Sequence, residues 1–361
     1  IAASVASAFD SQIAESTRAE TGRHLTDNTR AYAHFLKGRA LLHKRLELKG
    51  QGIDASIATF RAATRADPEF AHAWAGLSKA LWLRSASNEH QQEEDLASSA
   101  ALTALELDPG NAGARAVLGA IDWRKGSFER AKANFELALQ QPVVDTDVRL
   151  WAGILMDSVG YTDRAYALYE EADRLDPLNP SVNTFLSKSL VMRGEPEKAA
   201  RQLSGQIRHE WQDLNRGKIA LITGQYDQAQ ELLSNLELPV GTLPGRYVED
   251  VIQAMIDEHR KPSTEAAILQ AAETGKIDAK VAYQLLWLMG SAAILEVSDG
   301  IPTGLLALHI STDAWDSTTA AYRSDQRFHD WAFDVGLVQF WNANTWPRQC
   351  QSTSNFAFEC W

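Results

Sequence analysis

A 34-residue spacing is the feature of this sequence that most constrains its fold. Four glycines are each followed five residues later by an alanine, and successive glycines lie 34, 34 and 30 residues apart. The four pairs are Gly126 with Ala131, Gly160 with Ala165, Gly194 with Ala199, and Gly224 with Ala229. Two Leu-Asp-Pro-x-Asn segments, which begin at Leu107 and Leu175, are 68 residues apart, twice the same period. Two independent markers therefore predict an array of repeated units.

The residue types at this period predict that each unit is a pair of antiparallel helices. A glycine permits the tight turn after the first helix, and the small alanine lets the second helix lie close to the first. Pro68, Pro109 and Pro177 end their units, because proline cannot continue a helix and disfavours helix at the preceding residue. One pair cannot bury its apolar face, so neighbouring pairs must stack.

This unit resembles the tetratricopeptide repeat (TPR), a 34-residue helical hairpin. The family pattern places Gly or Ala at position 8, Ala at 20, an aromatic residue at 24, Ala at 27 and Pro at 32. Residues 146–179 match it with Gly153, Ala165, Tyr169, Ala172 and Pro177. The resemblance implies an all-α fold. It would be a right-handed superhelical solenoid of about five or six repeats, followed by a helical C-terminal extension.

The pattern divides the chain into four parts. We expect an N-terminal helix and linker at 1–30, the array at 31–238, a helical region at 239–347 and a cysteine-containing tail at 348–361. The expected repeats are 31–70, 71–111, 112–145, 146–179, 180–213 and a degenerate 214–238. The first two carry insertions, at 46–51 and 88–94, and the repeat at 180–213 lacks the closing proline.

Charge and apolar runs exclude two classes of partner. The chain has 35 Lys and Arg against 47 Asp and Glu, a net charge of −12. We expect no nucleic-acid partner, because such binding depends on cationic residues. The most apolar run, 281–295, is shorter than the roughly 20 residues of a membrane span, so it predicts a buried helix. The chain begins at Ile1 with no visible signal peptide, which indicates a fragment or a processed product.

Motifs for catalysis are missing from the sequence. It has no phosphate-binding Gly-x-x-x-x-Gly-Lys loop, no Gly-x-Gly-x-x-Gly after a strand, no His-Glu-x-x-His pair and no Gly-x-Ser-x-Gly turn. We therefore expect a non-catalytic chain without a cofactor or a metal site.

Both ends of the chain carry a second resemblance. Asp325–Phe328, Phe340-Trp341 and Trp346–Cys350, together with the entry segment 28–39, resemble a bacterial family with a TPR region. Its members place that region after a winged-helix transcriptional regulator or an adenylate-cyclase module, often across a membrane. The resemblance implies that this chain is the sensory or scaffolding part of a membrane-tethered regulator. Neither DNA binding nor cyclase activity would belong to these residues.

Cys350 and Cys360 are the only cysteines, and both lie in the tail. An even count within one loose, loop-like segment favours a local disulfide and therefore an oxidising compartment, periplasmic or otherwise extracytoplasmic. The alternative is a pair of ordinary thiols in the cytoplasm.

In a TPR array the first helix of each pair lines a concave groove. The resemblance places six candidate partner-binding residues there: Tyr32, Arg39, His72, Lys79, Trp82 and Trp123. Aromatic side chains combined with cations are typical of protein-binding hot spots, so we expect a protein or peptide partner. In the alternative interpretation, Trp82 and Trp123 are packing residues, and the expected helix at Ile1–Ile13 or the C-terminal helices partly fill the groove.

Two other functions stay open. A small-molecule sensor would have a polar-lined pocket among Trp287, Trp315, Trp331 and Trp341. A dimerisation scaffold would pair an apolar patch on a terminal helix with a second copy and form a homodimer.

Overall fold

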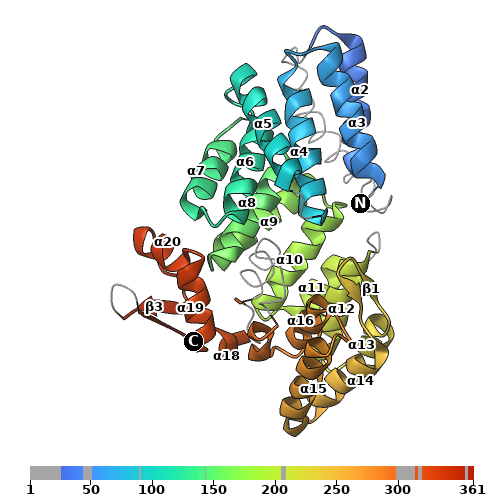
Figure 1. Cartoon of the computed structure of the whole chain (residues 1–361), viewed down its shortest axis with the longest axis vertical. Coiled ribbons are helices and arrows are strands. Elements are labelled where there is room, and N and C mark those ends of the chain that lie inside the picture. The colour runs from blue at the N-terminus through green and yellow to red at the C-terminus, as the bar shows by residue number, and fades with distance from the viewer. Residues whose placement is uncertain are drawn as a thin grey trace, which may run out of the picture. The chain divides into compact units, whose positions relative to one another are not determined.

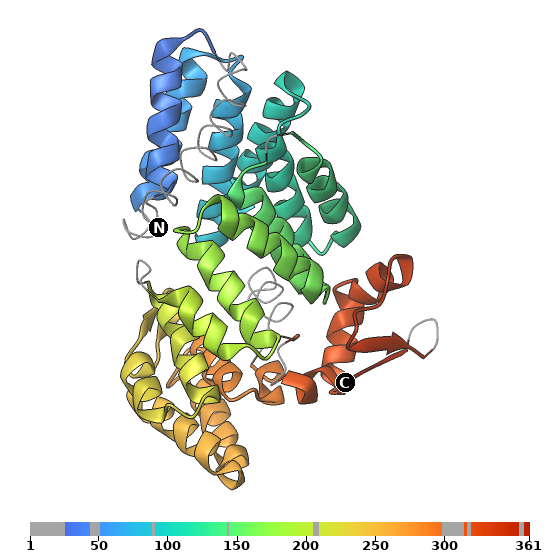
Figure 2. The same cartoon turned by 180° about the vertical axis from the view of Figure 1, so that it is seen from behind.

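The computed structural model describes residues 26–43, 51–88, 91–142, 144–204, 209–297, 314–315, 319–353 and 357–361. The chain divides into two compact units, residues 1–152 and 153–361. Figures 1 and 2 show from opposite sides that nearly all of the described chain is helical. The N-terminal helix expected within 1–30 and most of the insertion at 46–51 lie outside the described residues.

Unit 1 is built from helices that follow one another as antiparallel pairs. The pairs are α2 (Thr29–His43) with α3 (Gln51–Ala66), α4 (Ala71–Asn88) with α5 (Gln91–Leu107), and α6 (Ala112–Arg124) with α7 (Phe128–Leu139). The next helix, α8 (Thr146–Ser158), begins in unit 1 and ends in unit 2.

Unit 2 continues with paired helices and ends in shorter elements. The paired helices are α9 (Thr162–Leu175), α10 (Pro180–Met192), α11 (Pro196–Leu203), α12 (Glu210–Ile222) and α13 (Tyr226–Leu233). A short antiparallel hairpin follows, formed by the two-residue strands β1 (Glu237–Leu238) and β2 (Gly241–Thr242). The next elements are α14 (Gly245–Ile256), η1 (Glu258–Arg260), α15 (Lys261–Glu273), α16 (Ala279–Leu288) and η2 (Ala292–Leu295). The last elements are α18 (Ala320–Arg323), α19 (Gln326–Asp334), α20 (Leu337–Ala343), β3 (Cys350–Ser352) and β4 (Phe358–Cys360).

The residues that mark the repeat act at the helix ends. The four repeat glycines have positive φ values between 71° and 84°, the left-handed conformation that ends a helix with least strain in glycine. The asparagines of the two Leu-Asp-Pro-x-Asn segments begin the next helix. Asn111 accepts a hydrogen bond from the Ala114 N–H, and Asn179 accepts from those of Ser181 and Val182.

In three pairs of the described chain, a glycine of the first helix lies directly against an aromatic ring of the second. A methyl group added to Gly38 would come within 2.8 Å of the Phe60 ring, and one added to Gly153 within 2.5 Å of the Tyr169 ring. Phe60 and Tyr169 are fully buried. This repeated close packing defines an all-α solenoid of TPR type, which confirms the expected fold class.

Three segments differ from the expected description. The insertion at 88–94 lengthens α4 and α5 to 18 and 17 residues, against 13 for α6. The tail is an antiparallel β-hairpin, in which Cys350 pairs with Cys360, instead of a loop. The last part of the region expected to be helical, 239–347, contains only the short helices α18, α19 and α20 in its described residues beyond 303.

The apolar run 281–295 is buried, as expected. It is divided between α16 and η2, because Gly290 has a φ of 63° and ends the helical path. None of the helices in the described ranges combines the length and the hydropathy that crossing a membrane requires.

Candidate partner-binding surfaces

Three of the predicted groove residues gather around one buried ring in unit 1. Tyr32, Phe35 and Arg39 lie on α2, and His72 lies on α4. The Phe35 ring is 6.3 Å from the Tyr32 ring and 6.4 Å from the imidazole of His72, centroid to centroid, and the guanidinium carbon of Arg39 lies 5.6 Å from its centroid. Tyr32 is 37% exposed, whereas Phe35 is 5% exposed. We call Tyr32, Arg39 and His72 around Phe35 the α2 face.

Lys79 and Trp82 lie elsewhere, where α4 meets the start of α8. The Lys79 ammonium forms an ion pair with Asp147 and lies 5.9 Å from the centroid of the Trp151 ring. The Trp82 ring is 4.9 Å from that same ring and is 9% exposed. Lys79 is therefore held by a carboxylate of the chain itself, and Trp82 packs between helices.

Trp123 on α6 is 7% exposed. Together with the burial of Trp82, this favours the interpretation in which both tryptophans are packing residues. Of the six predicted residues, Tyr32 and Arg39 are exposed, His72 and Lys79 are half-buried, and both tryptophans are buried.

The four tryptophans of the sensor alternative do not form one cluster among the described residues. Trp315 and Trp341 pack edge to face with centroids 5.9 Å apart, and Trp331 reaches the same cluster through Phe328. Trp287, on α16, instead faces the ammonium of Lys218, which lies 3.8 Å from its centroid.

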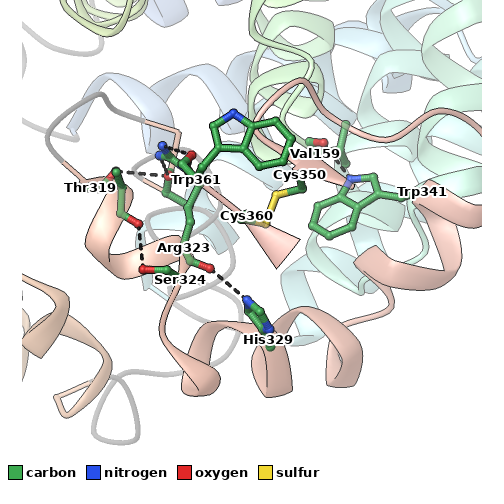
Figure 3. Close-up of a disulfide and its surroundings, with 11 residues drawn as sticks. Val159, Thr319, Arg323, Ser324, His329, Trp341, Cys350, Cys360 and Trp361 are labelled. Atoms are coloured by element: carbon green, nitrogen blue, oxygen red, sulfur yellow. Dashed lines mark hydrogen bonds between the residues drawn. A yellow bond between two sulfur atoms is a disulfide. The ribbon is translucent and has the colours of Figure 1, made fainter. Parts of the chain in front are cut away.

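A disulfide between Cys350 and Cys360 closes the C-terminal hairpin (Figure 3). Phe358 of β4 stacks on His329, with centroids 4.3 Å apart, and packs against Trp341 at 5.6 Å. The Arg323 guanidinium holds the chain end, because Nε and Nη2 donate to the Trp361 carbonyl oxygen at 3.1 and 2.8 Å. The tail is thus fixed to α18, α19 and α20.

Unit 2 also has a cleft of about 430 Å³, and none of the six predicted binding residues lines it. Helices α9, α10 and α11 line it. Tyr166 donates a 2.7 Å hydrogen bond to Glu170, and this bond and burial raise the pKa of Tyr166 to about 12. The sequence marks the repeat that holds α10 and α11 as irregular, because the repeat at 180–213 lacks its closing proline.

The described residues contain no group of three His, Cys, Asp or Glu side chains that could hold a metal ion.

No protein-family model and no curated protein matches this chain. Among solved structures, PilF of Pseudomonas aeruginosa is 20% identical with a TM-score of 0.41, over 56% of this chain and 90% of that chain. PilW, described as a widely conserved type IV pilus biogenesis factor, is 20% identical with a TM-score of 0.41, over 57% and 92%. A tetratricopeptide repeat protein from Parabacteroides merdae is 13% identical with a TM-score of 0.39, over 70% and 100%. The assignment of a TPR-type solenoid rests on the helical pairs of this chain itself.

Proposed function

We propose that this chain is a protein-interaction module whose α2 face binds a segment of a partner protein. The observation that carries the proposal is that the exposed ring of Tyr32 and the guanidinium of Arg39 lie 6.3 Å and 5.6 Å from the centroid of the buried Phe35 ring. Tyrosine and arginine are enriched among the residues that dominate binding energy in protein interfaces. Their place on a packed helix reduces the entropy lost when a partner orders them.

The chemistry of the α2 face indicates the kind of segment it takes. A guanidinium forms its strongest hydrogen bonds with carboxylates, often two at once. Tyr32 offers a large flat surface together with a polar hydroxyl. The partner segment would therefore present an acidic side chain next to an apolar or aromatic one.

The resemblance of both chain ends to bacterial regulators supplies the wider proposal. The module would be the sensory or scaffolding region of a membrane-tethered regulator, and the α2 face would receive its signalling partner. The disulfide between Cys350 and Cys360 supports an oxidising, extracytoplasmic compartment, since such bonds persist there.

Affinity capture from the native source tests the proposal. The immobilised wild-type chain is compared with Tyr32→Ala and Arg39→Ala, and with Arg65→Ala on α3 as a matched surface control. We expect one protein to be captured by the wild type and by Arg65→Ala but lost with both α2 variants. Equal capture by all four chains, or no specific capture, would contradict the proposal.

A further inference from the structure

The cleft in unit 2 is lined by residues of α9, α10 and α11. Helices α9 and α11 both pack on α10, and they occupy equivalent positions in successive repeats. At the 34-residue offset, the last residue of α11, Leu203, corresponds to Tyr169 of α9. The part of α9 after Tyr169 lies beyond the length that α11 matches. Glu170, Asp173 and Arg174 of that part line the cleft.

The floor of the cleft is apolar and comes from α10. Leu186 and Leu190, four residues apart on one face of the helix, are 4% and 5% exposed and line the cleft. This floor can accept the apolar side chain of a ligand.

The carboxylates of the cleft already accept hydrogen bonds from the chain. Glu170 accepts from the Tyr166 hydroxyl at 2.7 Å, and Asp173 accepts from the Gln202 amide at 2.8 Å. Burial raises the pKa of Asp173, because the charged carboxylate is less stable in the cleft than in water. A cationic ligand would have to compete with both of these donors.

Of the three cationic side chains that line the cleft, one forms an ion pair within the described part of the chain and two do not. Lys198 pairs with Glu195, the N-cap residue of its own helix. Arg174 on α9 and Arg201 on α11 are exposed, and neither forms an ion pair with any of the described residues. Each wall thus offers one guanidinium whose donors are available.

We propose that this cleft binds an acidic peptide segment, whose carboxylates pair with Arg174 and Arg201 while an apolar side chain rests on Leu186 and Leu190. This site is separate from the α2 face, so its failure would leave the proposed function intact. Arginine and carboxylate can form two parallel hydrogen bonds, which gives both affinity and orientation. From Tyr166 to Arg174 the wall is about 12 Å long at 1.5 Å per residue. That length accommodates about four residues of extended peptide.

Isothermal titration calorimetry of the whole chain with short, end-blocked synthetic peptides tests the proposal. The probe alternates glutamate and leucine, and two controls replace its glutamates by glutamine or by lysine. We expect saturable binding of the glutamate peptide alone. We expect Arg174→Gln and Arg201→Gln each to weaken it by at least about tenfold. Arg65→Gln in unit 1 is the charge-matched control and should keep the wild-type affinity. Affinity lost in Arg39→Gln instead of in the two cleft variants would assign the peptide to the α2 face and overturn the proposal.

A second readout separates the cleft from a general charge effect. The methyl NMR signals of Leu186 and Leu190 should shift when the glutamate peptide binds to the wild type and stay fixed with the glutamine peptide. The proposal is overturned if the lysine peptide binds better, if the arginine variants match the wild type, or if no peptide binds. Circular dichroism verifies that the two arginine variants keep their helix content.

Discussion

The indole N–H of Trp341 donates a 2.9 Å hydrogen bond to the backbone carbonyl oxygen of Val159, a residue 182 positions earlier in the chain. The Trp341 side chain is fully buried. The turn between α8 and α9 and the helix α20 are thereby joined within unit 2, and the Tyr161 hydroxyl adds a second bond, to the Thr345 carbonyl oxygen at 2.6 Å. Helix α20 and the segment that follows it therefore pack against the repeats of unit 2.

We predict that Trp341→Phe destabilises unit 2 by about 2–4 kcal/mol. The substitution removes a buried donor, leaves the Val159 carbonyl without it, and opens a cavity. The midpoint of thermal unfolding followed by near-ultraviolet circular dichroism measures the effect. Trp361→Phe is the matched control, because that side chain is 57% exposed and only its backbone carbonyl contacts Arg323. An equal loss in both variants would show that the Val159 bond is unimportant.

Reduction of the disulfide should loosen the C-terminal hairpin and leave the paired helices of unit 2 folded. A disulfide that closes a loop as short as the one between Cys350 and Cys360 stabilises the folded state by roughly 2–3 kcal/mol. It also fixes the strand β4, from which Phe358 packs against His329 and Trp341. The backbone amides of β3 and β4 should exchange with solvent faster after reduction. A Cys350→Ser, Cys360→Ser chain should exchange at the reduced rate with or without reductant. Unchanged exchange in both experiments would contradict this prediction.

The helical pairs were predictable because their markers are local. A glycine at the turn and an asparagine at the helix start act within a few residues of where they stand, as Gly126 and Asn111 show. The surroundings of Lys79 and Trp82 were not predictable in the same way. Asp147 and Trp151, which cover them, belong to a helix two pairs further along the chain. A repeat pattern gives the face of a helix on which a side chain lies, but not what packs over it.

The cleft and the tail show a similar limit. The missing proline near residue 211 indicates that the repeat at 180–213 departs from the family pattern. It does not indicate that Arg174 and Arg201 line the cleft from α9 and α11. The strands β3 and β4 have three residues each, which is too short for an alternating pattern to be recognised. The disulfide and the ring contacts of Phe358 position them.

Alkaline pH should destabilise unit 2 through Tyr169. Its hydroxyl donates to Asp157 at 2.9 Å, and burial, followed by the nearby Asp157 carboxylate, raises the pKa of Tyr169 well above the ordinary value of 10.0. The folded state favours the neutral phenol. The stabilisation that Tyr169 gives to the folded state is therefore complete below pH 10, and it is lost as the pH rises above that value and the tyrosine of the unfolded chain ionises. The loss amounts to about 1.4 kcal/mol per pH unit for one group.

Denaturant unfolding between pH 9 and 11 (roughly the range in which an unfolded tyrosine ionises) measures this dependence. Tyr169→Phe should be less stable than the wild type at neutral pH, because it loses the bond to Asp157, but should decline less steeply above pH 10. Tyr226→Phe, at the start of α13, is the control with one phenol fewer. Parallel slopes for Tyr169→Phe and the wild type would refute the assignment.

Gly153→Ala should disrupt the contact between the helices of its pair. The new methyl group would lie 2.5 Å from the Tyr169 ring, which is enclosed on all sides, so we expect a loss of about 1–3 kcal/mol. Gly113→Ala, on α6, is the control, since its nearest neighbour would be 3.6 Å away. The free energy of unfolding should rise or stay constant in the control and fall in Gly153→Ala. A fall of equal size in both would argue against close packing at Gly153.

The central claim is that the α2 face binds a partner protein, and site-specific photocrosslinking tests it most directly. A benzophenone amino acid replaces Tyr32 in the chain produced in its native cells, and a second chain carries it at Arg65 on α3. After irradiation, we predict one covalent adduct of defined mass from position 32, identified by mass spectrometry and missing from position 65. No adduct at position 32, or the same adducts from both positions, would contradict it.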